Sequence, residues 1–157
     1  MTASAEILII GPGRLGQCMA RWLCAAGRNV TLIGRSEFIP PAPLTWLTVP
    51  DRAIPEVAQA LPIGGVVLHA SGATDLLALA PHTEIGSLHP LMTFIGTEER
   101  EEMPAQIPAA VSGGASARAA AEALSRDLGF QTFDYEGDRR IYHAAAVISG
   151  NFATVLL

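Results

Sequence analysis

An aliphatic run that leads directly into a glycine-spaced turn constrains the fold more than any other feature of this chain. Residues 7 to 10 are isoleucine and leucine without polar alternation, which is typical of a parallel strand covered on both faces. The turn that follows consists of Gly11, Pro12, Gly13, Arg14, Leu15 and Gly16. Apolar residues at helical spacing then continue from Leu15 to Leu23. We therefore expect the strand, tight turn and helix that open a doubly wound α/β fold.

The same six residues predict a dinucleotide-binding site. Gly11 permits the tight turn, Gly13 lets the backbone approach a pyrophosphate, and Gly16 lets the helix pack close to the strand. The N–H groups and dipole at the start of the helix would face an anionic phosphate. The alternative is a glycine turn that only packs an α/β unit.

The end of the second expected strand, residues 29 to 33, indicates which dinucleotide binds. NAD-binding proteins usually carry an acidic residue here, but this chain has Gly34, followed by Arg35 and Ser36. The planar guanidinium donors and the serine hydroxyl suit a 2′-phosphate, which favours NADP. NAD remains open because Glu37 lies close by, and Arg35 could instead be an exposed loop residue.

The rest of the chain alternates between strand and helix patterns. We expect further strands at 44–49, 66–69, 107–112 and 131–135, and helices at 53–61, 115–128 and 140–157. The predicted fold is an α/β Rossmann domain with a doubly wound, mostly parallel sheet, followed by a long C-terminal helix. Residues 1–138 form the dinucleotide-binding domain in this interpretation. Residues 139–157 form the long helix, the start of a truncated or dimer-forming helical domain.

Composition excludes several classes of function. With 157 residues and a net charge of −5, the chain can build one full core and offers no basic surface for nucleic acid or membranes. The N-terminus lacks a signal or spanning segment, so we expect a cytoplasmic protein. Cys18 and Cys24 imply no disulfide and are both expected to be buried, and no metal-ligand spacing occurs. All ten basic residues are arginines, which excludes lysine chemistry within this sequence.

Five motifs in chain order resemble a known family. They are GPGRLG, WLTVPD, LHASGA, GSLHPLMTF and YHAAAVISGN. The chain resembles Rossmann-like oxidoreductases with a helical C-terminal domain, which are similar to pyrroline-5-carboxylate reductases and coenzyme F420-dependent NADP oxidoreductases of the 6-phosphogluconate dehydrogenase-like superfamily. The resemblance implies a small-molecule substrate and a helical domain that dimerises, here through the C-terminal helix, and closes the substrate cleft.

Two further segments are expected at the cofactor, because ligands bind at the carboxyl ends of strands in such sheets. Val49, Pro50 and Asp51 resemble the family turn that passes the adenosine ribose and pyrophosphate. Ala70, Ser71 and Gly72 are expected to approach the nicotinamide, with the Ser71 hydroxyl able to donate to a carbonyl. The alternatives are that Asp51 caps the following helix and that Ser71 only closes a tight turn.

The candidate catalytic residues are Ser71, His89, His143 and Asn151. Pro90 forces an extended backbone at His89, and a histidine that titrates near neutrality can act as a general acid. His143 and Asn151 share one face of the last helix, and neighbouring Tyr142 could donate a proton. A structural role for His89 and a packing role for the helix stay open. His69 is expected to be a hydrogen-bonded core residue, and His82 is given no role.

These observations predict an NADP-dependent oxidoreductase that moves hydride to or from a small carbonyl, imine or hydroxy compound. Related dehydrogenases carry a lysine and an asparagine on the last helix, so the absence of lysine means that their chemistry cannot simply be carried over. The alternative is a non-catalytic dinucleotide-binding module, such as a sensor or a dimeric scaffold.

Overall fold

The computed structural model describes residues 7–34, 37–97, 99 and 105–155, with side chains as far as residue 148. Its elements in chain order are β1 (Ile7–Ile10), α1 (Arg14–Ala25), β2 (Val30–Ile33), β3 (Leu44–Leu47), the 3₁₀ turn η1 (Asp51–Ala53), α2 (Ile54–Ala60), β4 (Val66–His69), the 3₁₀ turn η2 (Leu76–Leu79), β5 (Ile85–Pro90), β6 (Ile107–Gly113), α3 (Ala115–Leu128), β7 (Phe130–Asp134) and α4 (Arg139–Val155).

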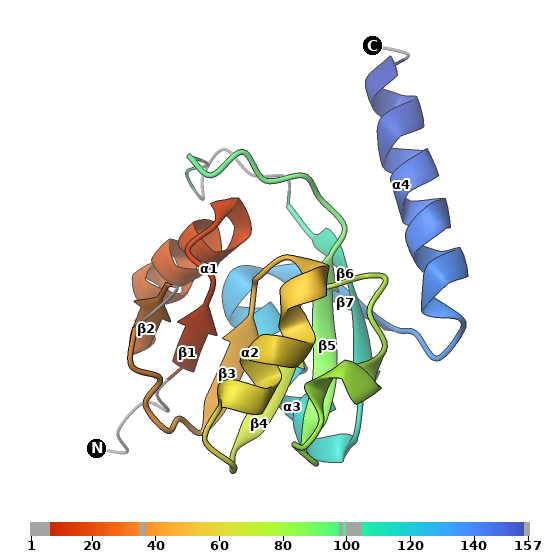
Figure 1. Ribbon diagram of the computed structural model, residues 1–157. Helices are drawn as coiled ribbons and strands as arrows, with labels where there is room; N and C mark the ends of the chain where they lie inside the picture. Colours follow the sequence, from red (N-terminus) through yellow and green to blue (C-terminus); the bar gives the residue numbers. More distant parts are fainter. Residues whose placement is uncertain (1–6, 35–36, 98, 100–104, 156–157) are drawn as a thin grey trace.

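The strands form one sheet in the order β2-β1-β3-β4-β5-β6-β7 (Figure 1). Strands β1 to β5 pair in parallel, β6 runs antiparallel to β5, and β7 is parallel to β6. The chain leaves β1 toward β2 and then returns to the other side of β1 to form β3. This reversal is the topological switch point, where open α/β sheets bind their ligands.

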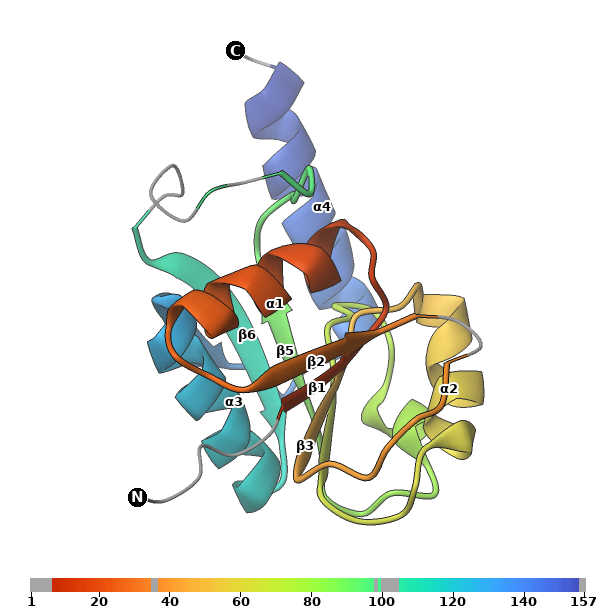
Figure 2. The same ribbon diagram turned by 90° about the vertical axis from the view of Figure 1, so that its left-hand side faces the viewer.

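Helices cover both faces of the sheet, as a doubly wound fold requires. Figure 2 shows α1 and α3 on one side and α2 on the other. Alternation along β1 places Ile7 and Ile9 in the core under α1 and α3, whereas Leu8 and Ile10 belong to the core under α2. This explains the unbroken aliphatic run, because every side chain of β1 has an apolar layer to enter.

The glycine turn brings β1 and α1 so close together that no side chain would fit between them. Gly11 has φ +115°, in the region that glycine adopts without strain. A Cβ at Gly16 would lie 2.0 Å from the Gly11 carbonyl oxygen and 2.6 Å from Thr48 Oγ1. Thr48 Oγ1 in turn donates to the carbonyl oxygen of Gly11 at 2.9 Å. The predicted roles of Gly11 and Gly16 in the turn and in helix packing are thereby confirmed.

Some sequence expectations were wrong in detail. Cys18 is buried but Cys24 is exposed, because it lies on the face of α1 turned away from the sheet. The helix expected from residue 53 begins as η1 and continues as α2. Helix α4 begins at Arg139, one residue earlier than expected, and continues to Val155, while residues 156 and 157 lie outside the described residues. No helix in the described part of the chain is long and apolar enough to cross a membrane.

Replacing Gly16 with alanine should destabilise the fold. Alanine favours a helix by roughly 1 kcal/mol over glycine, but overpacking against a backbone carbonyl costs about 1–3 kcal/mol, and at 2.0 Å the clash should dominate. We expect a lower melting temperature in thermal unfolding without cofactor. Gly13→Ala is the matched control, because a Cβ there meets nothing within 4 Å. Equal melting temperatures for Gly16→Ala and the unaltered protein would contradict the close contact.

Candidate functional site

A cavity opens at the switch point, beside the glycine turn. Its volume is about 500 Å³, and it is lined by residues at and after the ends of β1, β2 and β3 and by residues of α2. The predicted cofactor residues among them are Gly11, Pro12, Gly13, Gly34, Val49 and Pro50. Residues that the sequence analysis did not single out also line it: Ile10, Ile39, Thr48, Ala53, Glu56, Val57 and Ala60. Apolar side chains from β1 and α2, glycines of two turns and the side chains of Glu37 and Glu56 therefore share one cavity of a size that suits a ligand.

Gly13 marks the place where a ligand would approach the backbone. Its φ of −74° and ψ of −175° are open to any residue, and a Cβ there would meet no protein atom within 4 Å. Neither backbone conformation nor internal packing explains a glycine at this position. Gly13 also caps α1 without a side-chain hydrogen bond, so the first N–H groups of α1 have no side-chain acceptor there. The position fits the pyrophosphate of a dinucleotide.

An acidic side chain closes the turn after β2. The Gly34 N–H donates to Glu37 Oε1 at 2.5 Å, and Glu37 lies in the lining of the cavity together with Glu56. The described lining residues include no basic side chain, while Arg35 and Ser36 lie outside the described residues. The carboxylate of Glu37 is therefore held by the backbone next to the two residues on which the NADP prediction depends.

Several predicted cofactor residues do not line this cavity. Arg14 is exposed and packs against Gly96, Leu15 contacts the core, and Gly16 lies behind the turn. Asp51 is exposed in η1. The alternative that Asp51 caps the following helix is wrong, because the N-cap of α2 is Ala53 and no side chain caps it.

The segment after β4 forms a closed polar turn. Ser71 Oγ accepts hydrogen bonds from the N–H groups of Ala73 and Thr74, and it donates to Thr74 Oγ1 at 2.9 Å. The Ala70 N–H donates to the Leu47 carbonyl, which fixes this loop to the end of β3. The Ser71 hydroxyl is thus engaged within the turn, as the alternative interpretation expected.

His89, at the carboxyl end of β5, lies directly against this loop. A Cβ added at Gly72 would come within 2.6 Å of His89 Cε1, so only glycine lets the imidazole occupy this place. His89 Nδ1 lies 2.8 Å from the hydroxyl of Tyr142 on α4, with the two rings nearly perpendicular. The ring of His143 lies 6.5 Å from that of His89. The fold therefore brings together two predicted catalytic residues and Tyr142.

Burial sets the protonation of this cluster. It lowers the pKa of His89 to about 4, and the charges of His143 and Arg139 act in the same direction. Burial also raises the pKa of Tyr142 to about 12. Near pH 7 both side chains are neutral, so His89 differs from the expected histidine that titrates near neutrality.

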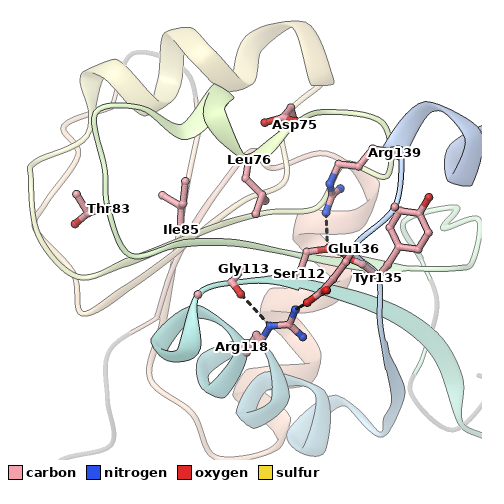
Figure 3. Close-up of a pocket in the computed structure, with 12 residues that line it drawn as sticks. Asp75, Leu76, Thr83, Ile85, Ser112, Gly113, Arg118, Tyr135, Glu136 and Arg139 are labelled. Carbon is pink, nitrogen blue, oxygen red and sulfur yellow. Dashed lines mark hydrogen bonds and ion pairs between the residues drawn. The ribbon is translucent and has the colours of Figure 1, made fainter.

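Arg139, at the start of α4, was missed in the sequence. Its guanidinium donates to the Ser71 carbonyl oxygen at 3.0 Å, to Ser112 Oγ at 3.0 Å and to Ser87 Oγ. Arg139 also lines a second cavity of about 350 Å³, where Figure 3 shows its bond to Ser112 and the ion pair of Arg118 with Glu136. The pairing of Ser87 with Ser112 across β5 and β6 only exists in the folded sheet, so no local sequence signal reveals this contact.

Four residues considered in the sequence analysis remain to be placed: His143, Asn151, His69 and His82. His143 lies at the cluster with its Nδ1 buried and unpartnered, and Asn151 lies in α4 with its side chain outside the described residues. His69 is fully buried, and its Nδ1 accepts from the Ser71 N–H at 3.2 Å, which confirms a hydrogen-bonded core residue. His82 bonds the Ala58 carbonyl oxygen through Nε2 at 2.9 Å. Among the described residues, no group of side chains could hold a metal ion.

Comparison with known proteins identifies relatives by structure alone, since no protein-family model and no curated protein matches the sequence. A protein from Thermotoga maritima is 23% identical, with a TM-score of 0.75 over 96% of this chain and 65% of that protein. A Bacteroides fragilis protein named as a candidate NADP oxidoreductase is 20% identical, with a TM-score of 0.78 over 98% of this chain and 70% of its own. A reductive aminase from Aspergillus terreus, solved with NADPH and ethyl-5-oxohexanoate, is 21% identical, with a TM-score of 0.71 over 98% and 63%.

This chain therefore spans between 63% and 70% of the length of these three proteins. At such identities the likeness shows a shared fold. It confirms the Rossmann-like, mostly parallel α/β architecture that the sequence predicted.

Protein stability should fall between pH 7 and pH 5. The folded-state pKa values of His69, about 3, and His89, about 4, lie below the ordinary 6.5, so the unfolded chain binds more protons in this range. Stability from both groups is present above pH 6.5 and is lost as the pH falls toward the folded values, by up to roughly 1.4 kcal/mol per pH unit for each histidine. Urea unfolding at pH 7 and pH 5 measures the difference, and His89→Gln should reduce it by about half. A free energy of unfolding that does not change with pH would contradict the burial of both histidines.

Proposed function

We propose that this protein is an NADP-dependent oxidoreductase that acts on a small carbonyl, imine or hydroxy compound. The observation that carries the proposal is Gly13, a glycine that neither conformation nor packing requires, at the edge of a cavity at the switch point. A pyrophosphate bound at the start of α1 would explain why this position is a glycine. The alternative module, which binds a dinucleotide without catalysis, shares this cavity and is distinguished by the assay described below.

The cofactor would lie across the carboxyl ends of the strands. The adenosine half occupies the cavity between the turn after β1 and α2, and the pyrophosphate lies at Gly11, Pro12 and Gly13. The nicotinamide half then extends toward the loop of Ala70, Ser71 and Gly72. NADP is favoured by Arg35 and Ser36, and the reductive aminase that shares the fold was solved with NADPH.

The bound nicotinamide supplies the hydride chemistry, so the protein has to orient the substrate and polarise the reacting bond. His89 is the residue that meets this requirement best, because it lies against the Gly72 loop and is not fully buried. As a neutral imidazole it can donate a hydrogen bond to the oxygen or nitrogen that gains electron density during reduction. His143 and Asn151 would line the same side of α4 as further polar groups.

Helix α4 would form the wall of the substrate cleft. It extends away from the sheet (Figure 1), and Ile141 and Ile148 are 69% and 67% exposed. We assign residues 1–138 to the dinucleotide-binding domain and α4 to the first element of a helical unit. An apolar face of this kind suits a homodimer through α4, because a second copy would cover the exposed isoleucines.

The test of the function is NADPH binding and oxidation by the full-length protein. Fluorescence titration with NADPH should give saturable binding that Gly13→Glu abolishes, since this side chain would place bulk and negative charge at the pyrophosphate site. Oxidation of NADPH should then be followed with a panel of small ketones, aldehydes and imines. Tight binding without turnover on any of them favours the non-catalytic module, and absence of binding rejects both functions.

Cofactor selectivity should depend on Arg35 and Glu37 in opposite directions. Arg35→Ala removes charge-assisted hydrogen bonds to the 2′-phosphate, so the Kd for NADPH should rise roughly 10- to 100-fold while that for NADH changes little. Glu37→Gln is the matched variant, which removes a negative charge beside the same site and should tighten NADPH binding. An equal rise in the Kd for NADPH and NADH in Arg35→Ala would show that the arginine does not bind the 2′-phosphate.

A further inference from the structure

The hydrogen bond between His89 and Tyr142 decides which nitrogen of His89 carries the proton. A neutral imidazole has one N–H donor and one acceptor nitrogen, and the hydrogen bond made by one nitrogen fixes the role of the other. With a donor at Nε2, His89 can polarise a carbonyl or an imine. With an acceptor at Nε2, it can only receive a proton from a hydroxyl group.

Two arrangements satisfy the 2.8 Å contact between His89 Nδ1 and the Tyr142 hydroxyl. Either the phenol donates to Nδ1, or Nδ1–H donates to the phenol oxygen. In the second arrangement the phenol proton needs another acceptor, and among the described residues the Tyr142 hydroxyl has no hydrogen-bond partner besides His89. The phenol is half-buried, and burial keeps it protonated. In the second arrangement its proton has only solvent as an acceptor, whereas donation to Nδ1 satisfies both groups within the protein.

The surroundings of His89 also disfavour the two remaining alternatives, a doubly protonated ring and a rotated ring. Protonation of the ring at both nitrogens is disfavoured because burial lowers the pKa of His89, and the charges of His143 and Arg139 act in the same direction. Rotation of the imidazole is restricted by the Gly72 backbone on one side and by the perpendicular Tyr142 ring on the other. His89 Nε2 has no protein partner among the described residues, so it is the nitrogen left for a ligand.

Tyr142 is itself held at the base of α4. Arg139, one turn earlier in the helix, bonds the Ser71 carbonyl and two serines of the sheet, and the Tyr135 ring lies 4.5 Å from the Tyr142 ring. The phenol therefore reaches His89 from a helix start that is attached to both the sheet and the Ser71 loop.

We propose that Tyr142 is a positioning residue, which donates to His89 Nδ1 and thereby keeps the Nε2 proton directed to a substrate oxygen or nitrogen. This deepens the proposed function, on which its catalytic meaning rests, and it predicts a site adapted to reduction of a carbonyl or imine. Tyr142 transfers no proton in this arrangement, in contrast to the sequence expectation that it could donate one.

The test is ¹⁵N NMR of the histidine side chains in the full chain at pH 7, with His89 resonances assigned by their loss in His89→Asn. We expect Nε2 to be protonated and Nδ1 to be unprotonated and hydrogen-bonded. In Tyr142→Phe the phenol no longer favours an unprotonated Nδ1, so the fraction of the Nδ1–H tautomer should rise and the Nδ1 resonance should move toward that of a protonated nitrogen. A proton on Nδ1 in the unaltered protein overturns the proposal, whether or not the protein is active.

Tyr135→Phe is the matched control, because its hydroxyl donates to the Asp138 carbonyl and not to His89. It should leave the His89 resonances in place. Once a substrate is found, Tyr142→Phe should lower kcat about 10-fold with the Kd for NADPH unchanged, the size expected for one lost hydrogen bond. An unchanged kcat in an active enzyme overturns the positioning role, whereas a protein without activity but with the expected tautomer rejects only the proposed function. The spectrum of the unaltered protein decides the tautomer even if a variant fails to fold.

Discussion

The close approach of α1 to the end of β1 is the constraint on which the rest of the site depends. The Gly16 Cα and the Gly11 carbonyl leave no room for a Cβ, and Thr48 bonds the same carbonyl from the end of β3. One contact thus fixes the helix, the turn and the neighbouring strand relative to one another. The first N–H groups of α1 consequently face the switch point of the sheet, where a cavity opens.

A second set of contacts, all polar, ties α4 to the other half of the sheet edge. Arg139 bonds the Ser71 loop and the serines of β5 and β6, and Tyr142 bonds His89. Burial of these groups makes each hydrogen bond important for stability. A buried polar group left without its partner would cost more free energy than the hydrogen bond contributes. The segment expected at the nicotinamide, the candidate donor His89 and the start of α4 therefore form one connected network.

Local pattern was sufficient to predict much of this architecture. The aliphatic run of β1, the glycine turn and the bounds of α3 at residues 115–128 follow from burial and periodicity, which act between neighbours in sequence. Cys24 shows where such reasoning fails, since the usual burial of a free cysteine predicted a core residue, but its face of α1 is turned away from the sheet. Arg139 shows the same limit for the site, because its serine partners lie 27 and 52 residues away in sequence.

The sequence by itself determined the fold class, the glycine turn and the extended backbone of His89 before Pro90, because each is set by residues adjacent in the chain. The tertiary structure decided what those residues can do. It placed the Ser71 hydroxyl inside a turn, buried His89 so that it stays neutral, and brought Tyr142 to its Nδ1 across 53 residues of chain. The physical reason is that protonation and hydrogen-bond direction depend on desolvation and on partners that only the packed sheet and α4 bring together.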